Sequence, residues 1–345
     1  MSGWSRITET KVKFLFFPIT LFYWGVIYWR NIFYNLNFFV SRKIPTKVIS
    51  VGNMTAGGTG KTPAVIYLSQ LFQTKNYKVA VLSRGYGRKT AGTQLVTDGN
   101  NKVNDWRNFG DEPTLMSQKL DNVPIVVDQN RYRGAMYLIE KFNPDMIIMD
   151  DAFQHRSIER DLDLVLLNSQ AGQSDYRLIP HGLLREPFSH IKRADVIIFT
   201  KSNLTEPSPK IVSRAKKTNL PIFNSSIAHN KFLNINSEVY KPENKTRAVA
   251  VSGIADPKSF YKSLDKTNIE LVSKIAYVDH YEFKQSDINQ LKKTLIDNSA
   301  EIIVTTEKDM IRLTNLDLGE INIYSLSIDF QLDEPGEKYI TNLFK

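Results

Sequence analysis

The chain has 345 residues, 42% of them hydrophobic, so it is long and apolar enough to form more than one folded unit. It contains no cysteine, which excludes a disulfide framework or a thiolate metal site and is typical of a reducing compartment. The formal net charge is +9, and +6 of it lies within residues 1–47, so the near-neutral remainder argues against a nucleic acid partner.

The first predicted element is an uncharged aromatic segment at residues 14–29, FLFFPITLFYWGVIYW. It is shorter than the roughly 20 apolar residues that span a bilayer, and Pro18 interrupts it. Its aromatic residues suit the headgroup boundary, and basic residues flank it on both sides. We predict that residues 10–40 form an amphipathic helix in the membrane interface. A single spanning anchor and a purely structural apolar helix are the alternatives.

The second predicted element is a phosphate-binding loop at residues 48–63, VISVGNMTAGGTGKTP. A β-branched strand runs into a glycine-rich turn, and Lys61 and Thr62 then open an apolar helix. In such a loop, backbone N–H groups bind phosphate oxygens, the lysine reaches the terminal phosphates and the threonine hydroxyl can bind Mg²⁺. The sequence therefore predicts an enzyme that uses ATP and Mg²⁺.

The loop departs from the strict P-loop pattern at one position, because Thr55 stands where that pattern has glycine. A related group of membrane-associated ATPases has lysine before the glycine pair, and Ala56 at that position argues against this group. An accidental glycine-rich turn is the alternative. The correct strand and helix on either side argue against it.

Alternating strands and helices follow the loop. We predict strands at residues 78–83, 94–98, 124–128, 146–151, 162–167 and 195–200, and helices opening at residue 110 and spanning 131–142. This alternation predicts an α/β fold, with a P-loop NTPase-like parallel sheet and helices on both of its faces. Ligands are then expected at the carboxyl ends of the strands.

Polar residues gather at these strand ends. Asp150 and Asp151 end a buried strand, which is the usual Mg²⁺ partner of a phosphate loop. Two carboxylates this close raise each other's pKa, so they need a cation nearby. The TKSN segment at residues 200–203 is similar to the guanine-reading element of GTPases, but Asn203 lacks the carboxylate that reads guanine. The loop at residues 181–187, HGLLREP, is either a solvated loop or an active-site lid.

A second α/β unit is predicted beyond the polar segment at residues 224–243, with strands at 247–252 and 301–306. Between them, Asp279 and His280 fall in a loop, where the neighbouring carboxylate would help the histidine act as a base. An exposed histidine without a catalytic role is the alternative. We expect three domains: a membrane-associated helix at 1–45, a P-loop kinase core at 46–230 and a smaller C-terminal α/β lobe at 231–345.

An ordered set of motifs resembles the tetraacyldisaccharide 4′-kinase family of lipid A synthesis: VGNMTAGGTGKTP, SRGYG, GDEP, DDAFQH, LLREP, DHYEF and TTEKD. The resemblance covers about residues 14–313, and in that family threonine at the start of the phosphate loop is ordinary. One departure is Ala152, where the family usually has glycine. The resemblance implies a P-loop core with a smaller C-terminal lobe, peripheral or monotopic at the cytoplasmic face of the bacterial inner membrane. We expect a monomer.

The resemblance also implies a reaction, the transfer of the ATP γ-phosphate to the 4′-hydroxyl of tetraacyldisaccharide 1-phosphate, which gives the 1,4′-bisphosphate lipid IVA. The expected ATP-binding residues are Thr55, Ala56, Gly57, Gly58, Thr59, Gly60, Lys61 and Thr62. The expected Mg²⁺ ligands are Thr62, Asp150, Asp151 and Glu186. The expected catalytic residues are Asp111, His280, Asp279 and Lys61. The expected substrate-binding residues are Arg84, Tyr86, Arg131, Gln154, His155 and Arg185.

Other functions stay open at this point. A membrane-associated regulatory ATPase or a GTPase would hydrolyse nucleotide without a lipid acceptor, and a membrane scaffold would bind no nucleotide. Asp111 also has a purely structural alternative, since a carboxylate in the first turn of a helix stabilises that helix.

Overall fold

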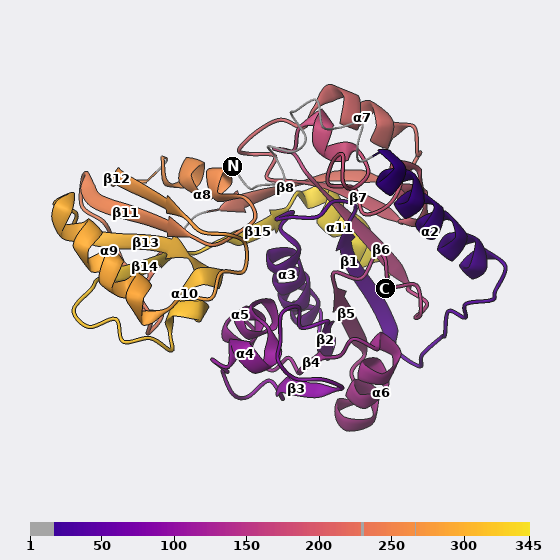
Figure 1. Cartoon of the computed structure of the whole chain (residues 1–345). Helices are drawn as coiled ribbons and strands as arrows, with labels where there is room; N and C mark the ends of the chain where they lie inside the picture. Colours follow the sequence, from indigo (N-terminus) through magenta and orange to yellow (C-terminus); the bar gives the residue numbers. More distant parts are fainter. Residues whose placement is uncertain (1–16, 229–230, 266) are drawn as a thin grey trace.

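The computed structural model describes residues 17–228, 231–265 and 267–345 (Figure 1). The fold is mixed α/β, and its strands form two separate sheets. The larger contains the phosphate-loop strand and is called the first sheet here; the smaller, built mainly from residues beyond 231, is called the second sheet. Figure 1 shows the second sheet to one side of the first, with its helices in orange.

Within the described residues the first sheet has nine strands in the order β15-β8-β7-β6-β1-β5-β2-β4-β3. Neighbouring strands are parallel except at the two edges, where β15 and β3 run antiparallel to their neighbours. The predicted parallel sheet is therefore confirmed. Its strands are β1 (Lys47–Asn53), β2 (Val79–Ser83), β3 (Gln94–Thr97), β4 (Ile125–Val127), β5 (Met146–Asp150), β6 (Leu162–Asn168), β7 (Val196–Thr200), β8 (Ile222–Ala228) and β15 (Asp329–Leu332).

Helices cover both faces of the first sheet because successive strand residues point to opposite sides. Ile49 packs into the core beneath α3, whereas Val48 packs into the core beneath α6. On the first face lie α3 (Lys61–Thr74), α4 (Trp106–Phe109), α5 (Asp111–Lys119) and α11 (Glu334–Asn342). On the opposite face lie α6 (Arg131–Phe142), α7 (Pro209–Lys216) and η3 (Phe188–Arg193).

The second sheet has six strands within the described residues, in the order β10-β9-β14-β13-β11-β12. The four strands from β14 to β12 are parallel to their neighbours, and β9 and β10 add an antiparallel edge. The strands are β9 (Phe232–Leu233), β10 (Val239–Tyr240), β11 (Thr246–Ser252), β12 (Ile269–Ala276), β13 (Ile302–Thr306) and β14 (Ile323–Leu326). On one face lie α9 (Gln285–Asp297) and α10 (Glu307–Leu313), and on the other α8 (Pro257–Leu264).

The end of the chain returns to the first sheet, which corrects the expected lobe at 231–345. Strand β15 pairs antiparallel with β8, and Phe330 enters the core beneath α3. The Tyr67 hydroxyl of α3 then donates a 2.6 Å hydrogen bond to Glu337 of α11. In Figure 1 the yellow end of the chain accordingly lies among the elements of the first sheet. Residues 329–342 therefore belong to the first sheet and the helices that cover it.

Helix α2 (Phe17–Asn35) precedes the first sheet and leaves much of its apolar surface exposed, with Phe22 75% and Trp29 56% exposed. None of the described helices has the length and apolar character needed to cross a membrane. The expected helix at 10–40 is present over Phe17–Asn35; residues 36–40 are not helical, and residues 10–16 lie outside the described residues. The predicted helix therefore ends five residues early, and its described part is an aromatic helix packed on the protein.

Candidate active site

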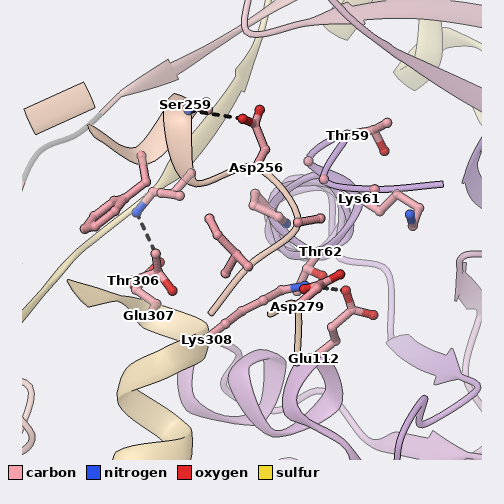
Figure 2. A pocket seen from close by; sticks show the side chains of 18 of the residues that line it. Thr59, Lys61, Thr62, Glu112, Asp256, Ser259, Asp279, Thr306, Glu307 and Lys308 are labelled. Carbon is pink, nitrogen blue, oxygen red and sulfur yellow. Dashed lines mark hydrogen bonds and ion pairs between the residues drawn. The ribbon is translucent and has the colours of Figure 1, made fainter. Parts of the chain in front are cut away.

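A cavity of about 380 Å³ lies between the two sheets, at the carboxyl ends of the central strands of the first sheet. The phosphate loop after β1 forms one wall, and residues that follow β11 and β13 of the second sheet form the facing wall. Figure 2 shows Lys61 and Thr62 on the first wall and Thr306, Glu307 and Lys308 on the second. A ligand in this cavity would therefore touch both sheets.

The phosphate loop has the backbone conformation that its glycines allow. Gly57 and Gly60 have φ angles of 108° and 85°, which strain any residue with a side chain. Two hydrogen bonds fix the loop beneath, since Asn53 donates to the Thr59 hydroxyl at 2.8 Å and the Thr200 hydroxyl donates to the Thr59 carbonyl at 2.9 Å. Residues 56–62 line the cavity, whereas Thr55 is buried under the loop and does not.

Lys61 is only 9% exposed, and its ammonium group lies 3.5 Å from Asp151. Arg185 donates to both oxygens of the same carboxylate, each at 2.9 Å. Burial raises the pKa of Asp151, but Lys61 and Arg185 outweigh it and hold the pKa at about 2. Asp151 is thus an anion between two cations at the mouth of the phosphate loop.

Asp150 is fully buried, and one of its oxygens accepts a 3.0 Å hydrogen bond from Ser83. The other oxygen has no hydrogen-bond partner among the described residues. Burial, Glu112 and Asp151 together raise the pKa of Asp150 to about 7. A cation would satisfy the unpaired oxygen and lower that pKa.

These groups fit Mg²⁺, which binds P-loop proteins through one or two carboxylates and a hydroxyl and takes its other ligands from phosphate and water. Thr62 and the Asp150/Asp151 pair are the residues that would hold it. Among the residues that the structure describes, no three His, Cys, Asp or Glu side chains converge on a metal position. A site of this kind would therefore be completed by the phosphates.

Glu186 does not fit the expected role of a metal ligand. Arg193 donates to both of its oxygens, at 2.8 and 2.9 Å, and His190 lies 3.0 Å from one of them. Gln154 donates to it as well, at 3.1 Å, and the side chain does not line the cavity. Glu186 has neither the unpaired oxygen of Asp150 nor the place of Asp151 in the cavity lining, so we remove it from the metal site.

A second acidic group lies where α5 meets the second sheet. Asp111 is 3% exposed, and His280 lies 3.1 Å away through Nδ1. Arg312 also donates to it. Burial raises the pKa of Asp111, but the His280 hydrogen bond, Lys308 and Arg312 together hold it well below its usual range. The pKa of His280 is raised in turn, mainly by the hydrogen bond to Asp111.

The predicted catalytic residues are thus brought together from distant parts of the chain. His280 and Asp279 line the same cavity as Lys61, and Nε2 of His280 lies 3.8 Å from the Asp279 carboxylate. Asp111 lies directly behind His280, just outside the lining. His280, Asp279 and the lysine of the phosphate loop therefore face one space.

The six expected substrate-binding residues divide into two groups. Tyr86 and Arg185 line the cavity, and the Tyr86 ring centroid lies 5.1 Å from that of His280. Arg84, Arg131, Gln154 and His155 are not part of the lining. Arg131 is 1% exposed and donates to the backbone carbonyls of Asp128 and Asp150, so its role is to hold the end of β5 rather than to contact substrate.

The end of the cavity away from Asp111 has a different character. Lys201, at the tip of β7, is 3.2 Å from Ser259 and 3.7 Å from Asp256. Apolar side chains surround them there: Leu204, Ile227, Ile254, Phe260 and Ile328. Asn203 is not available to read a base, because its amide donates to and accepts from the backbone of Ile227. The hydrophobic side chains at this end could hold an apolar ring, and Lys201, Asp256 and Ser259 could bind hydroxyl groups.

Comparison with known proteins decides the family. A family model described as tetraacyldisaccharide-1-P 4′-kinase, LpxK, matches residues 12–345. The chain belongs to the LpxK family. It is 32% identical over 357 residues to the tetraacyldisaccharide 4′-kinase of Halothermothrix orenii, a match that covers 96% of this chain and 92% of that one. It is 34% identical over 331 residues to the same enzyme of Aquifex aeolicus, covering 95% and 98%.

A solved structure gives the same result. LpxK from Aquifex aeolicus in complex with ATP is 33% identical, with a TM-score of 0.76, and the match covers 97% of this chain and all of that one. The chain is therefore a kinase, and its mixed α/β fold with a large parallel sheet matches that of LpxK. The regulatory ATPase, GTPase and scaffold alternatives are not favoured.

Several residues at the LpxK-family cavity were not predicted from the sequence. Lys308 forms an ion pair with Glu112 at the edge of the cavity, and Arg312 binds Asp111 behind it. Lys308 falls within the TTEKD motif, so the resemblance carried a signal for it, and Glu112 likewise follows Asp111 in GDEP. Arg312 lies beyond the motif, and its role depends on a contact between residues far apart in sequence.

Proposed function

We propose that this cavity transfers the γ-phosphate of ATP to the 4′-hydroxyl of tetraacyldisaccharide 1-phosphate, giving the 1,4′-bisphosphate in lipid A biosynthesis. One observation carries the assignment of residues. The phosphate loop with Lys61 belongs to the first sheet and His280 to the second, and both meet at one cavity, with Asp111 directly behind His280. A phosphate donor bound at the first and an alcohol bound near the second would lie side by side.

The nucleotide would lie along the cavity. The backbone N–H groups of the phosphate loop and the positive end of α3 would bind the triphosphate, and Lys61 would bind its terminal oxygens. The ribose and adenine would then extend to Lys201, Asp256 and Ser259 and the apolar side chains around them. The ATP complex of the Aquifex relative supports this choice of nucleotide.

Mg²⁺ bound by Thr62, Asp150 and Asp151 would offset the negative charge of the phosphates. Asp151 is kept anionic by Lys61 and Arg185, so it is ready to bind a cation at neutral pH. Arg185 also lines the cavity, where its remaining N–H groups would face the γ-phosphate.

A sugar hydroxyl is a weak nucleophile, so it must be held in line and lose its proton during transfer. Asp111 is the proposed acceptor. Its low pKa means that it takes the proton late, when bonding to phosphorus has acidified the hydroxyl. The oxygen–phosphorus bond forms as the bond to ADP breaks. Because His280 lines the cavity and Asp111 lies behind it, the proton would pass between the hydroxyl and Asp111 by way of His280, which then releases it to solvent.

Helix α2 is the proposed membrane contact. A tetraacylated substrate stays in the bilayer, and the exposed aromatic residues of α2, with the basic residues around them, suit the interface of an anionic leaflet. We propose a peripheral or monotopic position at the cytoplasmic face of the inner membrane. We propose that the enzyme acts as a monomer.

The test is transfer of ³²P from labelled ATP to a disaccharide 1-phosphate lipid in mixed micelles, beside a reaction without acceptor. We expect label in the lipid and little release of phosphate when the acceptor is omitted. Acceptor-independent hydrolysis at the same rate would contradict a lipid kinase. GTP in place of ATP tests the nucleotide.

A further inference from the structure

Arg312 is an arginine buried between the two sheets, with only 2% of its surface exposed. It lies on α10 of the second sheet and donates to Asp111 at the start of α5 of the first sheet. Its other end is held within the second sheet, by the Gly253 carbonyl at 2.9 Å and by Asp309 at 3.0 Å. The guanidinium group is therefore fixed on one sheet and presented to a carboxylate of the other.

The Asp111 carboxylate is fully engaged in this arrangement. One oxygen receives Arg312 and His280, and the other accepts a 2.9 Å hydrogen bond from the backbone N–H of Glu112. Two of the three donors are fixed in position, because the Glu112 N–H belongs to the first turn of α5 and the Arg312 guanidinium is buried. The third donor, His280, lines the cavity and can change its charge.

We propose that Arg312 is a positioning residue that holds Asp111 ionised and in a fixed orientation. Because Arg312 belongs to the second sheet and Asp111 to the first, Asp111 is held in this way only while the two sheets are in contact. The inference rests on the proposed role of Asp111 as proton acceptor and adds a requirement to it. Arg312 does not line the cavity, so it acts through Asp111 and through His280, whose Nδ1 lies 3.4 Å from the guanidinium group.

The physical reason is the constancy of the arginine charge. A carboxyl buried as deeply as Asp111 is protonated at neutral pH unless a cation is in contact with it. His280 cannot supply that cation throughout the cycle, because it must gain and lose a proton as it passes the proton on. Arginine keeps its charge at every working pH, so Arg312 preserves the acceptor form of Asp111 while His280 titrates.

Among the described residues, the other charged groups near Asp111 differ from Arg312 in how they act. From α10, Lys308 pairs with Glu112 of α5 and lowers the pKa of Asp111 through its charge, and Asp309 pairs with Arg312. From the loop after β12, Asp279 adds a negative charge near His280. Loss of Arg312 would thus leave His280 as the one cation in direct contact with Asp111 among the described residues.

The test compares the pH dependence of kcat and kcat/KM for three variants with that of the parent enzyme. Arg312→Met combined with Asp309→Asn, called the Met/Asn variant here, removes the guanidinium without leaving Asp309 as a buried unpaired charge. Arg312→Lys keeps a charge at the position. The control, Arg107→Met, makes the same change at an ion pair that crosses the same junction, 2.9 Å from Glu282, without contacting Asp111.

We expect the acidic limb of both profiles to move up by at least about one pH unit in the Met/Asn variant, so that activity lost on the acidic side is recovered as the pH rises. The Lys variant should keep the parental limb with a lower kcat, and Arg107→Met should keep the parental profile. KM for ATP should be unchanged in all three.

Two outcomes overturn specific parts of this account. A Met/Asn variant that loses activity equally at every pH, or loses none, shows that Arg312 is merely structural, and so does an equal shift in Arg107→Met. Asp111→Asn is measured alongside them: if it keeps its activity, the proposed role of Asp111 itself is wrong. An inactive Asp111→Asn with an unshifted Met/Asn profile contradicts the role of Arg312 alone.

Discussion

The Tyr23 hydroxyl of α2 donates a 2.6 Å hydrogen bond to the backbone carbonyl of Arg185, the residue whose side chain holds Asp151. Arg30 of the same helix donates to the backbone carbonyl of Gln154, and Asn31 lies 3.2 Å from His190. The helix proposed to lie on the membrane is thus bonded to the loop that supplies an arginine to the phosphate site.

Tyr23→Phe should lower kcat/KM for lipid phosphorylation by roughly fivefold, because a lost hydrogen bond of about 1 kcal/mol leaves Arg185 less well placed. Tyr28→Phe is the control, since Tyr28 is exposed on the same helix and stacks on Trp24 at 5.1 Å. Vesicle binding of both variants should match that of the parent. Equal activities for the two variants would show that the link has no influence.

Lys61→Ala should reduce ATP-dependent transfer at least about 100-fold, because the γ-phosphate loses its direct cation. Circular dichroism should show an unchanged fold, since Asp151 keeps Arg185 as a partner. Lys75→Ala, an exposed lysine just beyond the other end of α3, should have no effect. Full activity of Lys61→Ala would mean that the nucleotide binds elsewhere.

Asp111→Ala should lower kcat by about 10²–10⁴-fold while KM for the lipid changes little, as expected for a group that accepts a proton only during transfer. Steady-state kinetics with lipid and ATP varied separately will distinguish the two parameters. A variant that lost only lipid affinity would instead make Asp111 a substrate-positioning group.

Phe22→Asp with Trp29→Asp should weaken binding to anionic vesicles by at least roughly tenfold, because two exposed aromatic rings no longer enter the interface. Co-sedimentation measures the binding, and KM for the lipid should rise more than kcat falls. Phosphorylation of a water-soluble disaccharide acceptor should be unaffected. Unchanged sedimentation would remove α2 from the membrane contact.

His155 should make the folded protein sensitive to acid. Burial, with Arg131 nearby, lowers its pKa from 6.5 to about 4, so between these pH values the unfolded chain binds more protons than the folded one. Stability is therefore lost as pH falls from about 6.5 to about 4. His155→Gln should lose less stability over this interval than the parent in urea unfolding. Parallel curves would contradict a buried neutral imidazole.

Much of the first sheet could be predicted because its strands are buried runs that alternate with helices. The helix at Arg131–Phe142 was predicted with the bounds that the structure gives, and Lys61, after the loop that follows β1, does meet Asp151 at the end of β5. Side-chain spacing and the rule that parallel strands end at one edge were sufficient for these features.

Other features depend on contacts that no local pattern encodes. Strand β15 has only four residues, and nothing in its sequence distinguishes return to the first sheet from continuation of the second. Glu186 and Arg131 are charged residues in or beside recognised motifs, yet both side chains bind other groups inside the protein instead of a ligand in the cavity. Arg312 was missed for the opposite reason, because its partner lies 201 positions away in the sequence.

The return of β15 and α11 also affects biosynthesis. The sheet that carries the phosphate loop lacks one edge strand, and α3 lacks part of its covering, until residues 329–342 have been synthesised. The free edge of β8 would be open to association with other nascent chains during that interval. All six strands of the second sheet are synthesised between β8 and β15, so the first sheet is completed only after the second.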